Sequence, residues 1–432
     1  VYANNKGVVT GKVSGKINVS ASGDAYGIYA PDEGSSIDVT VMNTVTVTSA
    51  TGEATGVYAY GGGVILSGDQ ATVTADSGSG KDAYALRAQS SDIVLEQKGD
   101  VTLSATATGE GAAYGAYVPD ERKLNINTNG GVSVDITGGT KGAYGLYAES
   151  GTSSSDITAK AASGAIRISA KATSGGAAYG LVTSGDGASI SLSAGTISVD
   201  AANGAISANG GSVTVSADSR GSLAATGASA AVIYAANGAS IDLTNIDAAA
   251  GTSGMLVIGS GDSAITARNS VLSGDIKHSD LTLGGLNKTN IMTLSLLNDT
   301  TFTGKANSPR IDINIDNTSA WNVTGNSSTE GVLSNAGGTV SFVNDGTDNT
   351  SCYRKVTVSK LQGTGGKYLM HADLESGKGD QITADTSDVS GTIAIVSPVK
   401  KGAYRARMAE DLVRITGDKN SSFTLSGDTY EY

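Results

Sequence analysis

The hexapeptide AYGIYA occupies residues 25–30, and close relatives of it return along the first half of the chain. They read ATGVYA at 54–59, AYALRA at 83–88, AYGAYV at 113–118, AYGLYA at 143–148 and AYGLVT at 178–183. The second residue of this phrase recurs after 29, 29, 30, 30 and 35 residues. A regular spacing of this length is typical of solenoids, propellers and other arrays. The sequence therefore predicts a repetitive architecture.

Three short strand-like runs fill each interval. After the first phrase come SIDVTV at 36–41 and TVTVTSA at 44–50, in which apolar and polar residues alternate. Such runs, bounded by Gly, Ser, Asp and Asn, are typical of β-strands and turns. A propeller blade needs four strands in a longer repeat, and a leucine-rich repeat needs a fixed Leu and Asn pattern; the sequence has neither. The sequence therefore predicts an all-β fold, a right-handed three-sided parallel β-helix.

The phrase also predicts which side chains face the core, because successive side chains of a strand point to opposite sides. The fourth position is always apolar and is expected to face inward: Ile28, Val57, Leu86, Ala116, Leu146 and Leu181. The fifth position is expected to face outward: Tyr29, Tyr58, Arg87, Tyr117, Tyr147 and Val182. By the same parity the small third position, Gly27 in the first phrase, is expected to face outward beside the tyrosine.

The composition agrees with a thin core and narrows the range of partners. The chain of 432 residues has 60 Gly, 4 Pro, 3 Phe, 1 Trp and 1 Cys. The single Cys352 excludes an internal disulfide framework and leaves too few thiols for a cysteine-based metal site. The formal net charge of −12 disfavours nucleic acid and anionic membranes, because both bind proteins mainly through Lys and Arg.

The character of the sequence changes after about residue 262. The tyrosine phrase ends there, and strand-turn alternation continues with less regular spacing. The last segment has longer alternating strands and closes with SFTLSGDTYEY. We therefore expect three parts: a β-helix with tyrosine repeats at 1–262, irregular β-helix turns at 263–345 and a C-terminal β cap at 346–432.

Four stretches in the last two parts resemble the passenger domains of Gram-negative autotransporters, the family of the AIDA-type adhesins, antigen 43 and pertactin. They are ITARNSVLSGDI at 265–276, NTSAWNVTGNSSTEGVLSNAGGTVSFV at 317–343, YRKVTVSKLQGTGGKYLMHADLESGKGDQITA at 353–384 and SSFTLSGDTYEY at 421–432. The run at 356–383 is the most specific. The resemblance implies a β-helix whose C-terminal segment is autochaperone-like and nucleates folding outside the cell.

The resemblance also implies where the protein acts. The precursor would carry a removed signal peptide and a C-terminal outer-membrane β-barrel translocator that this chain lacks. The protein would then reside on the bacterial cell surface, on the extracellular side of the outer membrane, or be secreted after cleavage. The single Cys352 suits that route, since a disulfide-locked loop would obstruct the passage of an unfolded chain.

Two serine-containing stretches resemble protease motifs only superficially. They are ADSGSGKD at 75–82 and GTSGM at 251–255. Both protease families place histidine before serine in the chain, whereas the only histidines here, His278 and His371, come later. These stretches are better interpreted as turns between strands.

Two pairs of neighbouring carboxylates are the best candidates for metal binding or acid–base chemistry. Asp32 with Glu33 and Asp120 with Glu121 lie in the matching turns PDEG and PDER. A solvated turn is the simpler interpretation of both pairs. We therefore expect no enzymatic activity, no catalytic residues, no metal ligands and no cofactor.

The fifth-position column is the feature that points most directly to a function. Aromatic rings at regular spacing can stack on sugar rings or pack on a partner, and Tyr and Arg are favoured in interface hot spots. The alternative is a ladder that only stabilises the fold. The predicted binding residues are Tyr29, Tyr58, Arg87, Tyr117 and Tyr147, and the expected partner is a host-cell surface protein or glycan, or another copy of the chain.

Together these features favour a surface adhesin or self-association protein. Two alternatives of other classes stay open: a secreted effector that binds a host-cell receptor, and a polysaccharide-cleaving enzyme on the same scaffold.

Overall fold

The computed structural model describes residues 1–432 apart from 42–43, 79, 120, 152, 174, 280–289, 344–352, 374–377, 397–410 and 427–432. The chain forms two compact units, Val1–Gly254 and Met255–Tyr432. The predicted boundary at 262 lies eight residues beyond Gly254, and the one at 345 stays a prediction. Every regular element of the described residues is a β-strand.

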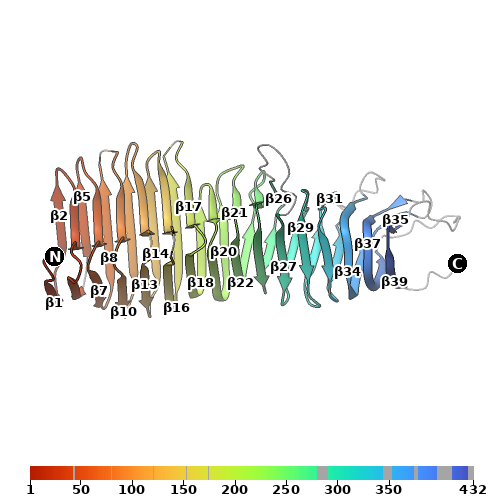
Figure 1. Cartoon of the computed structure of the whole chain (residues 1–432), viewed down its shortest axis with the longest axis horizontal. Helices are drawn as coiled ribbons and strands as arrows, with labels where there is room; N and C mark the ends of the chain where they lie inside the picture. Colours follow the sequence, from red (N-terminus) through yellow and green to blue (C-terminus); the bar gives the residue numbers. More distant parts are fainter. Residues whose placement is uncertain are drawn as a thin grey trace. The chain divides into compact units, whose positions relative to one another are not determined.

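The first unit is a parallel β-helix whose turns have three sides, as predicted, and before residue 155 each side is a separate strand. Strands of successive turns pair side by side and in parallel (Figure 1). The first row contains β1 (Val8–Val13), β4 (Ser36–Val41), β7 (Gly63–Gly68), β10 (Ile93–Gln97) and β13 (Lys123–Thr128). The second contains β2 (Ile17–Ala21), β5 (Thr44–Ser49), β8 (Ala71–Ser77), β11 (Val101–Ala107) and β14 (Val132–Gly138).

The third row is formed by the tyrosine phrases and the two segments that follow them. It contains β3 (Ala25–Ala30), β6 (Ala54–Ala59), β9 (Ala83–Ala88), β12 (Ala112–Pro119), β15 (Gly142–Glu149), β17 (Ala178–Ser184), β19 (Gly204–Asn209) and β21 (Ala231–Ala236). From residue 155 onward the first two rows merge into continuous strands: β16 (Ser155–Ala172), β18 (Ala188–Ala201), β20 (Ser212–Ala225) and β22 (Ala239–Ala249). Each merged strand therefore supplies two sides of one turn.

The fourth-position column forms part of the core, as predicted. Its side chains pair rung to rung, from Ile28 opposite Val57 to Leu146 opposite Leu181. All six predicted members are at most 1% exposed. The same column continues through Ile206 and Ile233, which the hexapeptide pattern did not include.

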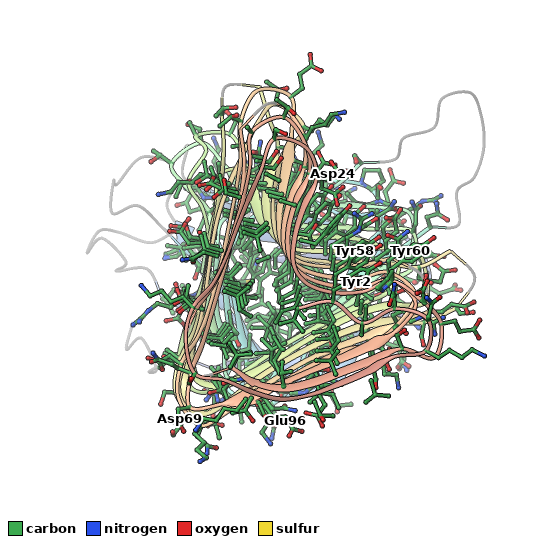
Figure 2. All side chains as sticks on the ribbon, turned by 90° about the vertical axis from the view of Figure 1, so that its left-hand side faces the viewer. Tyr2, Asp24, Tyr58, Tyr60, Asp69 and Glu96 are labelled. Carbon is green, nitrogen blue, oxygen red and sulfur yellow. The ribbon has the colours of Figure 1, made fainter. Side chains whose placement is uncertain are left out.

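The third phrase position faces inward, so the expected outward orientation of Gly27 and its equivalents is wrong. A Cβ atom on Gly27 would lie 2.6 Å from Cγ1 of the core residue Val45. The alternation of inward and outward side chains fails here, because the third and fourth positions both point inward. In the strand pairing, Tyr26 lies opposite Thr55 and Ile28 lies opposite Val57, with no pair for Gly27 between them. The strand bends at the glycine, and Figure 2 shows Tyr2, Tyr58 and Tyr60 on the concave side of that bend.

The second unit is built from shorter parallel strands. It contains β23 (Met255–Ser260), β24 (Ser263–Arg268), β25 (Val271–Ser273), β26 (Ile276–His278), β27 (Met292–Leu297), β28 (Thr301–Gly304), β29 (Ile311–Ile315), β30 (Ala320–Val323), β31 (Ser327–Ser328), β32 (Val332–Asn335) and β33 (Thr339–Phe342). The longer β34 (Lys355–Met370) and β37 (Gln381–Ile395) pair with each other, and β37 pairs with β38 (Val413–Ile415) and β39 (Lys419–Ser426). The short β35 (Ala372–Asp373) and β36 (Lys378–Gly379) form an antiparallel pair.

The core of the second unit uses larger side chains than that of the first. Phe302, Trp321, Phe342 and Tyr368 are all at most 1% exposed. The rings of Phe302 and Trp321 stack on neighbouring turns with centroids 6.1 Å apart, and the indole N–H of Trp321 donates to the carbonyl of Gly304 at 3.0 Å. The part of the chain that the structure describes contains no helix able to cross a membrane.

Candidate functional site

The bend at the third position brings two columns of side chains, instead of one, to the same outer face. Because the third and fourth positions point inward, the second and fifth point outward. The second-position column, here called the Tyr26 column, contains Tyr26, Thr55, Tyr84, Tyr114, Tyr144, Tyr179 and Gly204. The fifth-position column, here called the Tyr29 column, contains Tyr29, Tyr58, Arg87, Tyr117, Tyr147, Val182, Ser207 and Tyr234.

From Tyr26 to Tyr147 the rings of the two columns, with Arg87 between them, pack into one surface, here called the tyrosine face. Tyr29 and Tyr58 stack nearly parallel, with centroids 5.0 Å apart and planes 5° apart. Tyr84 and Tyr114 stack in the same way at 4.8 Å and 5°. Contacts also cross between columns, as between Tyr26 and Tyr29 at 4.7 Å. Aromatic pairs at these distances add about 0.5–1.5 kcal/mol each beyond the area they bury.

In the Tyr26 column Thr55 stands where the neighbouring turns have tyrosine, and this gap would interrupt the stack of rings. The side chain of Arg87, from the Tyr29 column, fills the gap. Its guanidinium lies 4.9 Å from the ring centroid of Tyr58 and 4.6 Å from that of Tyr84, so it joins the two groups of rings through cation–π contacts. Arg87 Nη1 also donates to Glu53 Oε1 at 2.7 Å, and the Thr55 hydroxyl donates to the same oxygen at 3.2 Å. A small residue in one column is thus matched by a long one in the other.

The tyrosine face is less exposed than the sequence suggested. Tyr58 is only 6% exposed and Tyr84 5%, because neighbouring rings cover them. Tyr29, Arg87, Tyr117 and Tyr147 are half-buried. The outward direction predicted for the five residues is right, but neighbouring side chains bury Tyr58 within the face.

Burial also changes the acidity of the phenols. Desolvation raises the pKa of Tyr26 to about 12 and that of Tyr58 to about 12. For Tyr117 desolvation raises the pKa as well, and the hydrogen bond that its hydroxyl donates to Glu149 Oε2 at 2.7 Å adds to the effect. The neutral phenol is the form that the folded face accommodates.

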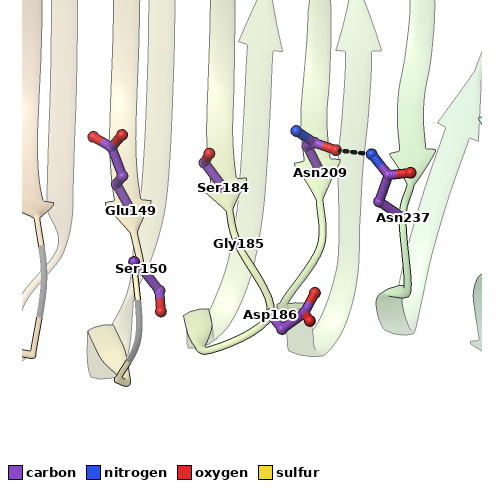
Figure 3. Close-up of a pocket in the computed structure, with 8 residues that line it drawn as sticks. Glu149, Ser150, Ser184, Gly185, Asp186, Asn209 and Asn237 are labelled. Carbon is purple, nitrogen blue, oxygen red and sulfur yellow. Dashed lines mark hydrogen bonds between the residues drawn. The ribbon is translucent and has the colours of Figure 1, made fainter.

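A polar pocket adjoins the far end of the tyrosine face. It has a volume of about 430 Å³, and Figure 3 shows Glu149, Ser184, Asn209 and Asn237 side by side on successive turns. The Asn237 side-chain N–H donates to Asn209 Oδ1 at 2.6 Å. Sequence reasoning missed this row, although Glu149, Ser184 and Asn209 each stand two residues after the fifth phrase position or its equivalent.

Two of the four carboxylates considered from the sequence, Asp32 and Glu121, link neighbouring turns. Asp32 Oδ2 accepts the backbone N–H of Asn5 at 2.7 Å and so holds the turn of the neighbouring rung. Glu121 Oε1 accepts the hydroxyl of Ser153 on the next turn, and Asp120 lies outside the described residues. Among the residues that the structure describes, no group of three or more His, Cys, Asp and Glu side chains could hold a metal ion.

The fold and the tyrosine face together define a parallel β-helix protein that presents a repeated aromatic surface. No protein-family model matches the chain, and no curated protein matches it. Among solved structures it is similar to the crystal structure of the autotransporter UpaB from E. coli strain CFT073. The two chains are 15% identical, with a TM-score of 0.43, over 97% of this chain and 93% of that chain.

Proposed function

We propose that this chain is the passenger of a Gram-negative autotransporter and acts, without enzymatic activity, as an adhesin or self-association protein on the bacterial surface or after release. The observation that carries the proposal is the tyrosine face, which repeats one surface on turn after turn of a parallel β-helix. The resemblance of 353–384 and 421–432 to autotransporter passengers supports the class. Its partner is a host-cell surface protein or glycan, or another copy of the chain.

The chemistry of the face suits weak, repeated contacts. Tyr29, Tyr117 and Tyr147 are half-buried, so each presents part of a ring whose position is already fixed by contact with a neighbouring ring. Little side-chain entropy is lost when such a pre-ordered ring meets a partner. Each contact is small, and contacts on successive turns that engage together sum to a higher avidity.

Clumping of coated beads tests the proposal directly. Beads carrying the purified chain are compared with beads carrying the triple variant Tyr29→Ser, Tyr117→Ser and Tyr147→Ser, which leaves the buried Tyr58 and Tyr84 in place. We expect the wild-type beads to aggregate or to adhere to cultured host cells. The extent of aggregation or adhesion should be at least tenfold lower for beads that carry the variant.

A second column of outward side chains, on another side of the β-helix, supplies the matched control for the tyrosine variant. Ile65, Val94 and Asn125 pair on successive turns of β7, β10 and β13 and face outward. The triple variant Ile65→Ser, Val94→Ser and Asn125→Ser should clump and adhere like the wild type. Equal losses in both triple variants, with circular dichroism unchanged, would show that the tyrosine face has no special role.

A further inference from the structure

The Tyr29 column is interrupted beyond Tyr147 by two smaller residues. Val182 and Ser207 occupy the next two turns, and an aromatic side chain returns only at Tyr234. With strands about 4.8 Å apart, the interruption spans roughly 14 Å from Tyr147 to Tyr234. The ring of Tyr234 does not close it, because it meets Tyr179 of the other column edge-on, with centroids 5.9 Å apart and planes at 90°.

Polar side chains border this interruption along its whole length. Glu149 and Ser184 stand two residues beyond Tyr147 and Val182 in the same strands and on the same face, and Asn209 stands two beyond Ser207. Asn237 follows β21, where a positive φ of 52° turns it toward Asn209. In Figure 3 these side chains line one side of the polar pocket, with Asp186 at its far end. The lining itself consists of polar residues and glycine, and Tyr147 reaches it through the hydrogen bond between its side chain and that of Ser184.

The charge of the pocket restricts its ligand. Its described lining includes Glu149 and Asp186 and neither Lys nor Arg. Carboxylates repel sulfated or carboxylated polymers, and they accept hydrogen bonds from neutral hydroxyl groups. The amides of Asn209 and Asn237 supply donors as well as acceptors.

We propose that this pocket, together with the interruption beside it, binds a neutral saccharide of one or two rings, with its apolar face on the half-buried Tyr147 and its hydroxyl groups on Glu149, Asn209 and Asn237. The inference rests on the proposed function and names the ligand class of one end of the tyrosine face. The volume of about 430 Å³ falls within the range of about 300–1,000 Å³ that is usual for small-molecule sites. The combination of ring surface and paired amides distinguishes this place from the rest of the face.

Saturation-transfer NMR on the purified chain tests the inference with lactose, maltose and N,N′-diacetylchitobiose as neutral probes and a heparin-derived disaccharide as the acidic one. We expect transfer to at least one neutral probe and none to the acidic probe. The variant Ser207→Tyr fills the interruption and leaves every polar group of the pocket in place. It should therefore lower the affinity for the neutral probe at least tenfold. Binding of the acidic probe alone, or of no probe, would overturn the inference.

Two further variants keep the test decisive if Ser207→Tyr does not fold. Asn209→Ala and Asn237→Ala each remove a hydrogen-bonding group from the pocket, so each should weaken the binding of the neutral probe. The control is Asn129→Ala, which alters a second polar pocket that Glu96, Gln97 and Lys98 also line. This variant should bind the neutral probe as the wild type does. If the beads still clump through the tyrosine face while no sugar binds, the saccharide site is wrong and the proposed function stands. If sugar binds while the tyrosine-face variant clumps normally, the saccharide site stands and the proposed function is wrong.

Discussion

At the residue scale, the pair of Arg87 and Glu53 holds the tyrosine face together where the Tyr26 column has Thr55. Both side chains are largely buried, with 17% of Arg87 and 25% of Glu53 exposed. Burial raises the pKa of the Glu53 carboxyl above its ordinary 4.5, and Arg87 opposes that shift. The ion pair therefore sets the protonation of Glu53 as well as the packing of the rings.

Replacing Arg87 by Met should destabilise the first unit in a pH-dependent way. The variant keeps much of the side-chain volume and leaves the Glu53 carboxylate without its charged donor, which costs about 2 kcal/mol at neutral pH. A carboxyl whose folded pKa is raised contributes stability below its unfolded pKa of 4.5 and loses it as pH rises through the folded pKa. Urea unfolding should therefore show a larger difference from the wild type at pH 7 than at pH 4.

The double variant Arg87→Met with Glu53→Gln provides the control for this prediction. It removes the buried charge, so it should recover part of the lost stability at pH 7 and show little difference between the two pH values. A single variant that is equally destabilised at both pH values would contradict the account.

At the element scale, the bend of the phrase strand decides what the outer face presents. Within the six phrases the third position is glycine or alanine, because the interior of those turns leaves little room for a larger side chain. A Cβ atom on Gly145 would lie 2.4 Å from Cγ2 of Ile168 and 2.4 Å from the carbonyl oxygen of Gly180 on the next turn. The six phrases have glycine at this position in five cases and alanine at Ala85, whereas the two later strands of the row have Ala205 and the buried Val232.

Substituting Gly145 by Val should therefore destabilise the first unit by about 1–3 kcal/mol through overpacking. The matched substitution Gly15→Val places the same side chain where nothing lies within 4 Å of the new Cβ atom. It should change the free energy of unfolding by less than about 0.5 kcal/mol. Equal effects of the two substitutions in urea unfolding would refute the inward orientation of the third position.

The same bend explains which features could be predicted from the sequence. The period, the three strands per turn and the inward Ile28 column depend on local alternation, and the sequence displays all of them. The inward Gly27 and the outward Tyr26 break the alternation of side chains with a period of two. Strand parity therefore predicted the wrong orientation for Gly27 and gave no reason to place Tyr26 on the outer face. The contact of Arg87 with Tyr58 and Tyr84 and the row from Glu149 to Asn237 arise between turns, where one strand's pattern carries little information.

At the scale of the whole molecule, the protonated phenols tie the stability of the first unit to pH. Tyr26 and Tyr58 have pKa values raised to about 12 by desolvation, against an ordinary 10.0. An acid whose folded pKa is raised contributes stability below its unfolded pKa and loses it as pH rises toward the folded pKa. The tyrosine face should therefore contribute fully at neutral pH and lose its contribution between about pH 10 and 12.

Alkaline titration checks this behaviour. Tyrosinate absorbance and far-ultraviolet circular dichroism are followed together as the pH is raised. We expect most tyrosines of the first unit to ionise well above pH 10, in a step that coincides with loss of β-structure. Ionisation of nearly all tyrosines near pH 10, with the β-signal intact, would mean that the rings are not packed as described.

The central claim is that adhesion comes from many weak contacts along the tyrosine face, and the most direct test is bead adhesion as a function of the surface density of the chain. Beads carrying the wild type are compared with beads carrying the Tyr29→Ser, Tyr117→Ser and Tyr147→Ser variant, on cultured host cells and on beads of the same kind. If the claim holds, wild-type adhesion rises more steeply than in proportion to density, and the variant stays near background at every density. Adhesion that rises in simple proportion to density and is equal for the two proteins would contradict it.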